Sequence, residues 1–323
     1  MNWALWRKNL IESQWLLWSC AGGLFAFAWV RVWMVSLLEM ERFKAIFEQF
    51  RALEHLSPVP FDLFFTWPGR VSLAFDEPLV WGIVSVWAIA RGSDCVSGEL
   101  GRGTMEMLLA QPLSRMQILL TSTLVTWGGL LVLGGAVLAG MAVSIQTTQV
   151  KVVPPAPKWG VTLPGLPAWE FSVPGTSGEP IREPLRDYVT IGQFLPGVLN
   201  LLALGFFLCG LATLVSACDR YRSRTLGIVG GVFAVSLAVK LVARAAQLNW
   251  LLYTTFFTAY EPSVIILQVV REPAAAWAFW VQTKEGGWQA GPLTYDLSLV
   301  GMGLAAYLAG AVIFARRDLP APL

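Results

Sequence analysis

Charged residues are scarce in this chain. Of its 323 residues, 23 are Lys or Arg and 21 are Asp or Glu, so the formal net charge is only +2. A nucleic-acid-binding protein normally carries a concentrated basic surface and a clearly positive charge. We therefore expect no nucleic-acid partner.

Histidine and cysteine are also rare. The chain has one histidine, His55, and four cysteines at Cys20, Cys95, Cys209 and Cys218, none in a CxxC pair. Zinc sites and Cys/His nucleophiles need these residue types in closer groups. With two of the cysteines expected inside membrane spans and two in cytoplasmic segments, a structural disulfide is not expected either. The sequence predicts no catalytic residue, no metal site and no bound cofactor.

Apolar residues, by contrast, are abundant. They make up 55% of the sequence, and 16 of the residues are tryptophan. This composition is typical of an integral membrane protein, in which tryptophan favours the boundary between hydrocarbon and water. We predict a single, all-α transmembrane domain over residues 1–323.

Six apolar runs predict six transmembrane helices, because a helix needs about 20 apolar residues to cross about 30 Å of hydrocarbon. The predicted spans are Gln14 to Leu38, Glu77 to Ala90, Met116 to Ser144, Ile191 to Ala217, Leu226 to Ala246 and Thr294 to Ala315. The second is short, so we expect it to begin near Val71 or to continue past Arg91. Residues 1–13 predict an interfacial helix that leads into the first span.

The short loops indicate the orientation. If the spans alternate, one side carries all the basic clusters, namely Arg7 and Lys8, then Arg91, Arg102 and Arg115, then Arg220, Arg222 and Arg224, and finally Arg316 and Arg317. An excess of Lys and Arg in short loops marks the cytoplasmic side. We therefore expect both termini in the cytoplasm.

Three longer segments, 39–76, 146–190 and 247–293, then lie outside the cytoplasm. Glu39 to Leu56 has the apolar spacing of an amphipathic helix, and Val153 to Pro184 is rich in Pro and Gly and predicts an extended cap. Asn249 to Val270 is apolar but is broken at Glu261-Pro262. We favour two short re-entrant or interfacial helices there over a seventh span, which would move the C-terminal arginines outside.

The polar segment from Arg91 to Arg115 separates the second and third spans. Its glycines, Gly98, Gly101 and Gly103, predict an interruption of the helix that enters from the second span. Thr104 is a candidate N-cap for a short helix from Thr104 to Ala110, with Glu106 near its positive end.

The residues after the short helix predict where it ends and where the third span begins. Pro112 disfavours helix at the preceding residue, and Ser114 with Gln117 forms a capping-box pattern for the third span. On the short helix, Met105, Leu108 and Leu109 share one face. We expect a helix that packs on the membrane domain and presents a charged edge.

The run GSDCVSGELGRGTMEMLLAQPLSRMQILLTS, at 92–122, resembles the segment between spans two and three of type-two ATP-binding cassette (ABC) exporter permeases. The ending Phe314-Ala315-Arg316-Arg317-Asp318-Leu319 is similar to the F.RRDL tail of that family. The basic connection SACDRYRSRT and the broken segment FFTAYEPS also agree with the family pattern. This chain differs at Ser97 to Leu100, where the family often has acidic residues.

The resemblance implies a bacterial inner-membrane exporter permease. In such proteins the segment forms a coupling helix that rests on a cytoplasmic ATPase subunit. The residues implied in this contact are Gly98, Glu99, Arg102, Gly103, Thr104, Glu106, Leu108, Leu109, Pro112 and Arg115. The sequence has neither a G-x-x-x-x-G-K-[ST] loop nor an LSGGQ signature, so ATP and Mg²⁺ are expected on the partner. Two ATPase subunits would serve two permeases, as a homodimer or a related heterodimer.

Three cations fall within predicted spans, at Arg31, Lys240 and Arg244. Long cations near a span end usually extend to the headgroups, although they could instead line a path for an anionic substrate. Gly227 and Gly231 are expected to allow close helix packing within the subunit, or else at a dimer seam.

Two other functions remain open at this point. A secondary transporter would usually show carboxylates deep within its spans, and the six spans show none near their centres. A non-transporting scaffold could use the same loop to recruit an ATPase. The substrate does not follow from the sequence.

Overall fold

The computed structural model describes residues 3–37, 66–152, 158–161, 169–172, 181–282 and 287–317. In this part of the chain, six helical segments are long and apolar enough to cross a membrane. The predicted all-α membrane fold is thereby confirmed. The predicted amphipathic helix at Glu39 to Leu56 lies outside the described residues.

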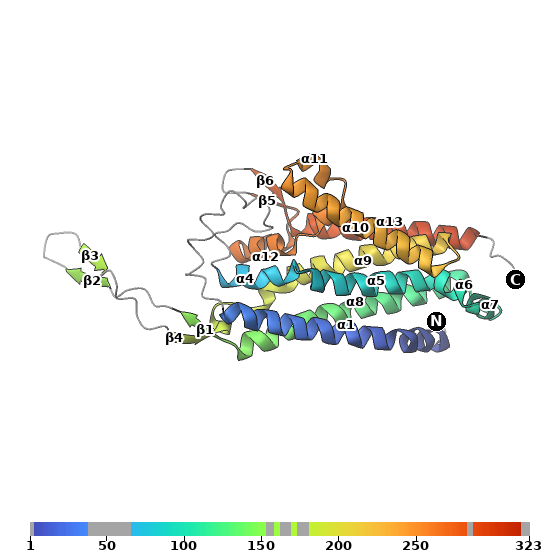
Figure 1. Ribbon diagram of the computed structural model, residues 1–323, viewed down its shortest axis with the longest axis horizontal. Coiled ribbons are helices and arrows are strands. Elements are labelled where there is room, and N and C mark those ends of the chain that lie inside the picture. The colour runs from blue at the N-terminus through green and yellow to red at the C-terminus, as the bar shows by residue number, and fades with distance from the viewer. Residues whose placement is uncertain are drawn as a thin grey trace.

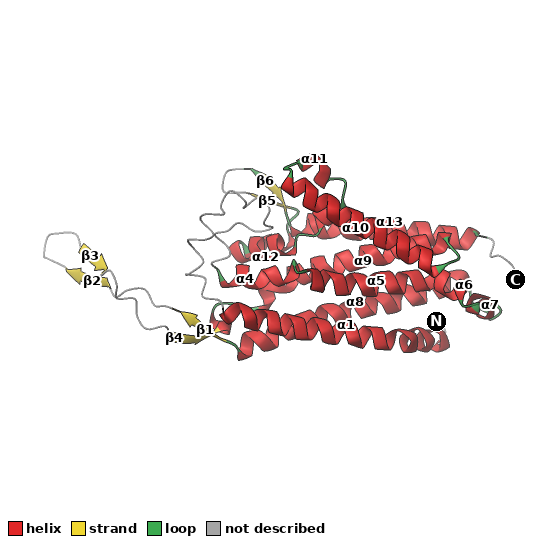
Figure 2. Ribbon diagram, in the orientation of Figure 1, coloured by secondary structure: helices red, strands yellow, loops and turns green. Residues whose placement is uncertain are grey.

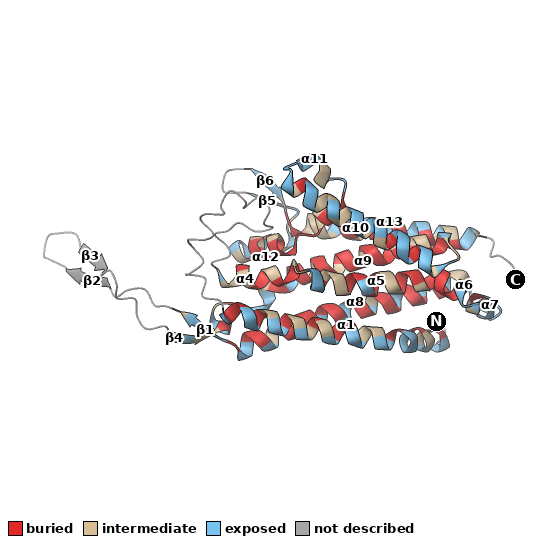
Figure 3. Cartoon of the chain, viewed as in Figure 1, coloured by how far each residue is buried: buried red, intermediate tan, exposed pale blue. Residues whose placement is uncertain are grey.

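The long helices form an elongated bundle in which they run roughly side by side (Figure 1). Its members are α1 (Trp3–Leu37), α5 (Pro78–Ser93), α8 (Arg115–Thr147), α9 (Leu195–Cys218), α10 (Arg222–Ala245) and α13 (Pro292–Arg316). Of the candidate spans, the one that contains α9 is the most buried and α10 is the least. The packing partners of α9 include α5, α8, α10 and α13, so it forms the centre of the bundle (Figure 3).

The first helix runs without a break from Trp3 to Leu37. The predicted interfacial helix over 1–13 is therefore not a separate element. Ser13, which sits at the expected boundary, is buried and donates its hydroxyl to the carbonyl of Leu10 at 3.2 Å. A serine that bonds back within the helix does not cap a new one. At 1.5 Å per residue, α1 is about 50 Å long and exceeds the hydrocarbon thickness.

The second span extends in both of the expected directions. It comprises α4 (Trp67–Ser72), the 3-10 turn Leu73–Phe75, α5, the π-helical turn Asp94–Gly98 and α6 (Glu99–Gly101). Together they make a helical candidate span over Trp67–Gly101. The apolar stretch Glu77 to Ala90 that the sequence marked is only its middle.

The two ends of the bundle differ. We call the end that carries α7 (Thr104–Leu109) the α7 end, and the opposite end, which carries α12 (Pro262–Arg271), the α12 end (Figure 1). Between α10 and α12 lie only α11 (Asn249–Leu252) and the 3-10 turn Phe256–Ala259. The predicted break at Glu261-Pro262 is confirmed, and 249–270 is not among the candidate spans.

Short antiparallel ladders complete the described chain (Figure 2). The pairs are β1 (Gln149–Val152) with β4 (Ile181–Pro184), β2 (Lys158–Val161) with β3 (Trp169–Ser172), and β5 (Trp280–Gln282) with β6 (Trp288–Ala290). The extended backbone predicted for Val153 to Pro184 is confirmed in the parts that the structure describes.

Candidate functional site

The short helix α7 lies at the end of the bundle, between α6 and the long helix α8 (Figure 1). It begins directly after Gly103, which has φ +72°. This left-handed backbone favours glycine, so Gly103 supplies the sharp turn between α6 and α7. The helix covers Thr104–Leu109, within the predicted range, and Ala110 caps its end.

The predicted interruption at Gly98 and Gly101 is wrong, as is the N-cap role of Thr104. Gly98 belongs to the π-helical turn and Gly101 ends α6, while Gly103 takes the N-cap position. Thr104 donates its hydroxyl to the Glu99 carboxylate at 2.5 Å and to the Glu99 carbonyl at 3.2 Å. Its side chain therefore ties α7 to α6.

Gly98 has a packing role that the sequence pattern did not reveal. A Cβ atom at this position would lie 2.1 Å from Oδ1 of Asp94. Real Cβ contacts are never this short, so any larger residue would displace the Asp94 side chain. Gly98 thus leaves room for a carboxylate at the centre of the site.

The predicted two-sided character of α7 is confirmed. Met105 and Leu108 are buried in two small apolar clusters that include residues of α1, α8, α9 and α13. Glu106 and Met107 lie on the open side, and the Met107 side chain is 72% exposed. Met107 was not among the residues predicted from the sequence, although its apolar side chain outside the Met105, Leu108 and Leu109 face was an available signal.

Glu99 is the first of two carboxylates that bind several cations. It is only 6% exposed, and its Oε1 accepts hydrogen bonds from Lys8 at 2.6 Å and from Arg102 at 2.9 Å. Lys8 comes from α1, so this contact joins the amino-terminal helix to the α6–α7 turn. Sequence reasoning missed Lys8 as a partner because the two residues are 91 positions apart.

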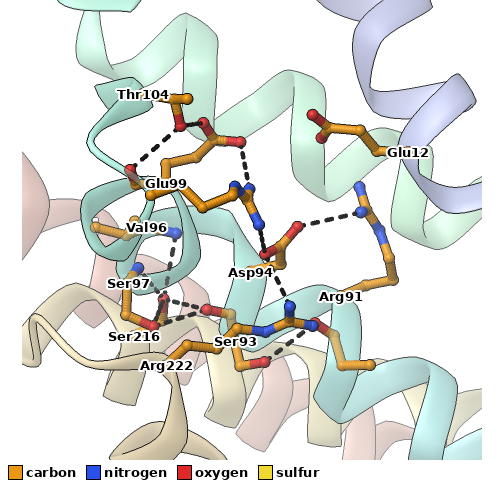
Figure 4. Close-up of polar contacts among 12 residues, drawn as sticks. Glu12, Arg91, Ser93, Asp94, Val96, Ser97, Glu99, Thr104, Ser216 and Arg222 are labelled. Atoms are coloured by element: carbon orange, nitrogen blue, oxygen red, sulfur yellow. Dashed lines mark hydrogen bonds and ion pairs between the residues drawn. The ribbon is translucent and has the colours of Figure 1, made fainter. Parts of the chain in front are cut away.

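Asp94 is the second such carboxylate and holds three arginines (Figure 4). Its oxygens lie 2.7 Å from Arg102, 3.3 Å from Arg222 and 3.6 Å from Arg91. The hydrogen bond to Asp94 raises the pKa of Arg102 above its usual range, and Glu99 adds to this effect. Arg222 is the first residue of α10, so Asp94 links α10 to the π-helical turn Asp94–Gly98.

The π-helical turn is fixed by hydroxyl groups from neighbouring helices (Figure 4). Ser216 of α9 accepts from the backbone N–H groups of Val96 and Ser97, at 3.2 and 2.8 Å, and donates to the carbonyl of Ser93 at 3.0 Å. The Ser97 hydroxyl also lies 3.2 Å from that of Thr225 in α10. These bonds satisfy backbone groups that a π turn leaves without their usual helical partners.

Arginines also donate hydrogen bonds to the carbonyl groups at the C-terminal ends of two long helices. Arg115 donates from Nη1 to the carbonyls of Phe314 at 3.2 Å and Arg317 at 2.6 Å, at the end of α13. Arg317 donates in turn to the carbonyl of Ala217 at 2.8 Å, at the end of α9. Cations at these carbonyls complement the negative end of the helix dipole. The predicted capping box of Ser114 is confirmed.

The ten predicted contact residues do not form one surface. Those exposed at the α7 end are Arg102, Gly103, Glu106 and Pro112, whereas Gly98, Glu99, Thr104, Leu108, Leu109 and Arg115 are buried or half-buried. The first group is available to a partner. The second group is at least partly covered by the rest of the bundle.

The other predicted cations are all paired. Glu261 binds Lys240 at 2.9 Å and Arg244 at 2.5 Å at the α12 end, and Arg31 lies 3.3 Å from Glu77. Glu261 was not predicted from the sequence as the shared partner of Lys240 and Arg244, although a carboxylate inside a broken apolar stretch was a signal. Across the described residues, no group of His, Cys, Asp and Glu could hold a metal ion.

Comparison with known proteins agrees with this architecture. No curated protein sequence matches the chain. The sequence model of one protein family, described as ABC-2 family transporter protein, matches residues 31–319. The match begins inside α1, at residue 31, and includes α6, α7 and the start of α8. It does not include Lys8, the α1 residue that binds Glu99. Since it covers most of the sequence, the chain belongs to the ABC-2 transporter family and is the membrane permease component of an ABC transporter, whose partner is an ABC ATPase component.

Proposed function

We propose that this permease is the membrane subunit of an ATP-driven exporter, with α7 as the coupling helix that rests on a separate ATPase subunit. ATP and Mg²⁺ bind to that subunit, and this chain carries no catalytic residue. The α7 end then faces the cytoplasm of a bacterial inner membrane. Two permeases, identical or related, work with two ATPase subunits.

The two faces of α7 carry this proposal. One face inserts Met105 and Leu108 into the bundle, and the other presents Glu106 and Met107. The Met107 side chain is 72% exposed, so this face offers an apolar contact beside the charge of Glu106. Methionine is enriched at protein interfaces because its flexible thioether adapts to a partner.

The polar contacts explain how movement of α7 would reach the spans. Glu99 connects the α6–α7 turn to Lys8 of α1, and Asp94 connects it to Arg222 of α10. Ser216 joins the adjoining π turn to α9. A displacement of α7 therefore acts on several spans at once, which is what coupling to a transport cycle requires.

The basic residues support the orientation. Lys8, Arg91, Arg102, Arg115 and Arg222 all contribute contacts at the α7 end. Lys and Arg accumulate in the short cytoplasmic loops of membrane proteins. The same bias supports a cytoplasmic position for both termini.

The test is Met107→Asp, studied with the cognate ATPase subunit in proteoliposomes. Placing a charge in the centre of a protein contact typically costs about 1–3 kcal/mol, so we expect about tenfold weaker binding of the ATPase subunit. We also expect loss of the stimulation that the permease gives to ATP hydrolysis. Met107→Leu should behave like the unmodified chain.

A matched control is Ile181→Asp, because Ile181 is also exposed but lies in β4, outside the candidate spans and away from the α7 end. Normal binding and normal stimulation by Met107→Asp would contradict the role of α7. Recruitment of the ATPase subunit by the unmodified chain, with no change in its ATP hydrolysis rate, would favour a scaffold over an exporter.

A further inference from the structure

A cavity of about 330 Å³ lies near the α7 end of the bundle. Residues of α1, α5 and α10 contribute to its lining. Its lining residues are Glu12, Leu16, Ala90, Arg91, Asp94, Arg102 and Arg222. This volume is within the range of small-ligand pockets. The lining joins the charged groups of the site to apolar residues of two spans.

The charges of this cavity do not balance. Three arginines face two carboxylates, which leaves one positive charge in excess. One of those carboxylates, Glu12, also lies 3.7 Å from Lys8. Glu99, which lies outside the lining, binds both Lys8 and Arg102. With Lys8 and Glu99 counted, four cations face three carboxylates, so one positive charge still remains in excess. An anion is the ligand that would complete this arrangement.

Two arginine N–H groups without acceptors also indicate an anionic ligand. Nε of Arg91 and Nε of Arg222 are both buried, and neither has an acceptor among the residues that the structure describes. Arg91 is only 4% exposed, and its other contacts are with Asn9 and Asp94. A buried donor of a charged group is costly when it has no acceptor. A ligand with several acceptor oxygens would satisfy such donors.

The position of the cavity identifies the source of the anion. Leu16 and Ala90 belong to spans, whereas Glu12 and Asp94 lie towards their polar ends. Trp15, adjacent to Leu16 in α1, is 79% exposed. Exposed tryptophans concentrate at the level of the lipid headgroups. The cavity therefore lies where a phospholipid can place its phosphate while its acyl chains stay in hydrocarbon.

We propose that this cavity binds the phosphate group of an anionic phospholipid through Arg91, Arg102 and Arg222. Arginine is suited to this task because its planar fork of N–H groups matches phosphate oxygens. The lipid would bridge α1, α5 and α10 beside the coupling helix. Its presence would therefore stiffen the same three helices that Asp94 and Glu99 connect to α7.

Native mass spectrometry of the purified chain tests the proposal, with phosphatidylglycerol and phosphatidylcholine as the two probes. We expect the anionic lipid to bind about tenfold more tightly, and Arg222→Gln to remove most of that preference. The control is Arg224→Gln, which makes the same charge change at an exposed residue two positions further along α10. Arg224 stacks over Tyr221 and does not line the cavity.

A second variant distinguishes a specific loss of lipid binding from a loss caused by misfolding. Glu12→Gln removes a negative charge from the cavity lining, so it should strengthen phosphatidylglycerol binding severalfold, a gain that a damaged protein would not show. Equal binding of the two lipids, or equal losses in Arg222→Gln and Arg224→Gln, would overturn the proposal. Competition by glycerol phosphate at the concentration of the lipid would also overturn it and would assign the cavity to a soluble phosphate.

Discussion

The two ends of the bundle each contain a buried polar network, and the two networks are built differently. At the α12 end, Lys240 directs its ammonium group to Glu261 and to the carbonyls of Phe257 and Tyr260, each at 2.9 Å. All three N–H groups of the lysine can therefore be satisfied. At the α7 end, Arg91 keeps a buried N–H without an acceptor in the described chain.

This difference separates a structural network from one suited to binding. In the α12-end network Glu261 pairs with Lys240 and Arg244, and Asn200 donates to Asp296 at 2.8 Å and to the carbonyl of Ala259 at 3.0 Å. These contacts fix α12 against α9, α10 and α13. The α7-end network has surplus donors and extends to the exposed side chain of Arg102. Surplus donors and exposed charge are what a ligand or a partner protein can use.

The largest effect is expected from Glu261→Gln at the α12 end. Glu261 is 9% exposed and is the shared carboxylate of Lys240 and Arg244. Removing one partner of a buried ion pair leaves an uncompensated charge, which costs about 3 kcal/mol or more. Thermal unfolding of the purified protein in detergent should show a clearly lower midpoint.

The control for this prediction is Glu272→Gln, an exposed carboxylate just after α12. It should leave the unfolding midpoint almost unchanged. If both variants unfold at the same temperature, the α12-end network does not stabilise the fold, and the contrast between the two ends fails.

A smaller effect is expected from alanine at two glycines that pack helices at opposite ends. At Gly92, a Cβ would lie 2.6 Å from Cβ of Ala212 and 2.8 Å from the carbonyl oxygen of Cys209, so α5 and α9 would have to separate. At Gly197 the obstacle is the side-chain tip of Ile266, at 2.5 Å, which can move. Overpacking costs about 1–3 kcal/mol, and Gly92→Ala should approach the upper part of that range.

Urea or thermal unfolding of the two variants measures this difference. Gly82→Ala is the matched control in α5, because a Cβ there meets nothing within 4 Å. It should be neutral or slightly stabilising, since alanine favours helix. A larger loss in Gly197→Ala than in Gly92→Ala would show that the α12 end is the more tightly packed of the two.

The fold could be predicted from the sequence because its signals are local. The length of each apolar run gives a span, Glu261-Pro262 breaks the stretch before the last helix, and Ser114 with Gln117 starts α8. These features depend on residues a few positions apart. The amphipathic face of α7 was predictable for the same reason.

The contacts of the site could not be predicted because they depend on packing. Glu99 pairs with Lys8 across 91 positions, and Ser216 lies 119 positions from Ser97. Gly98 and Gly101 suggested a break, but the hydrogen bonds that Ser216 accepts from Val96 and Ser97 keep that region helical. Tertiary contacts thus overrode a local propensity.

The smallest effect is expected from Lys8→Gln at the α7 end. Lys8 is partly exposed, and Glu99 keeps Arg102 and Thr104 as partners when the lysine charge is lost. The pair should therefore contribute only about 1 kcal/mol. Arg7→Gln changes the adjacent exposed cation and serves as the control. Hydrogen exchange should show faster opening of the α6–α7 turn in Lys8→Gln than in Arg7→Gln, because Lys8 is the residue of the two that bonds to Glu99. Equal exchange in the two variants would mean that the Lys8–Glu99 ion pair does not hold the α6–α7 turn against α1.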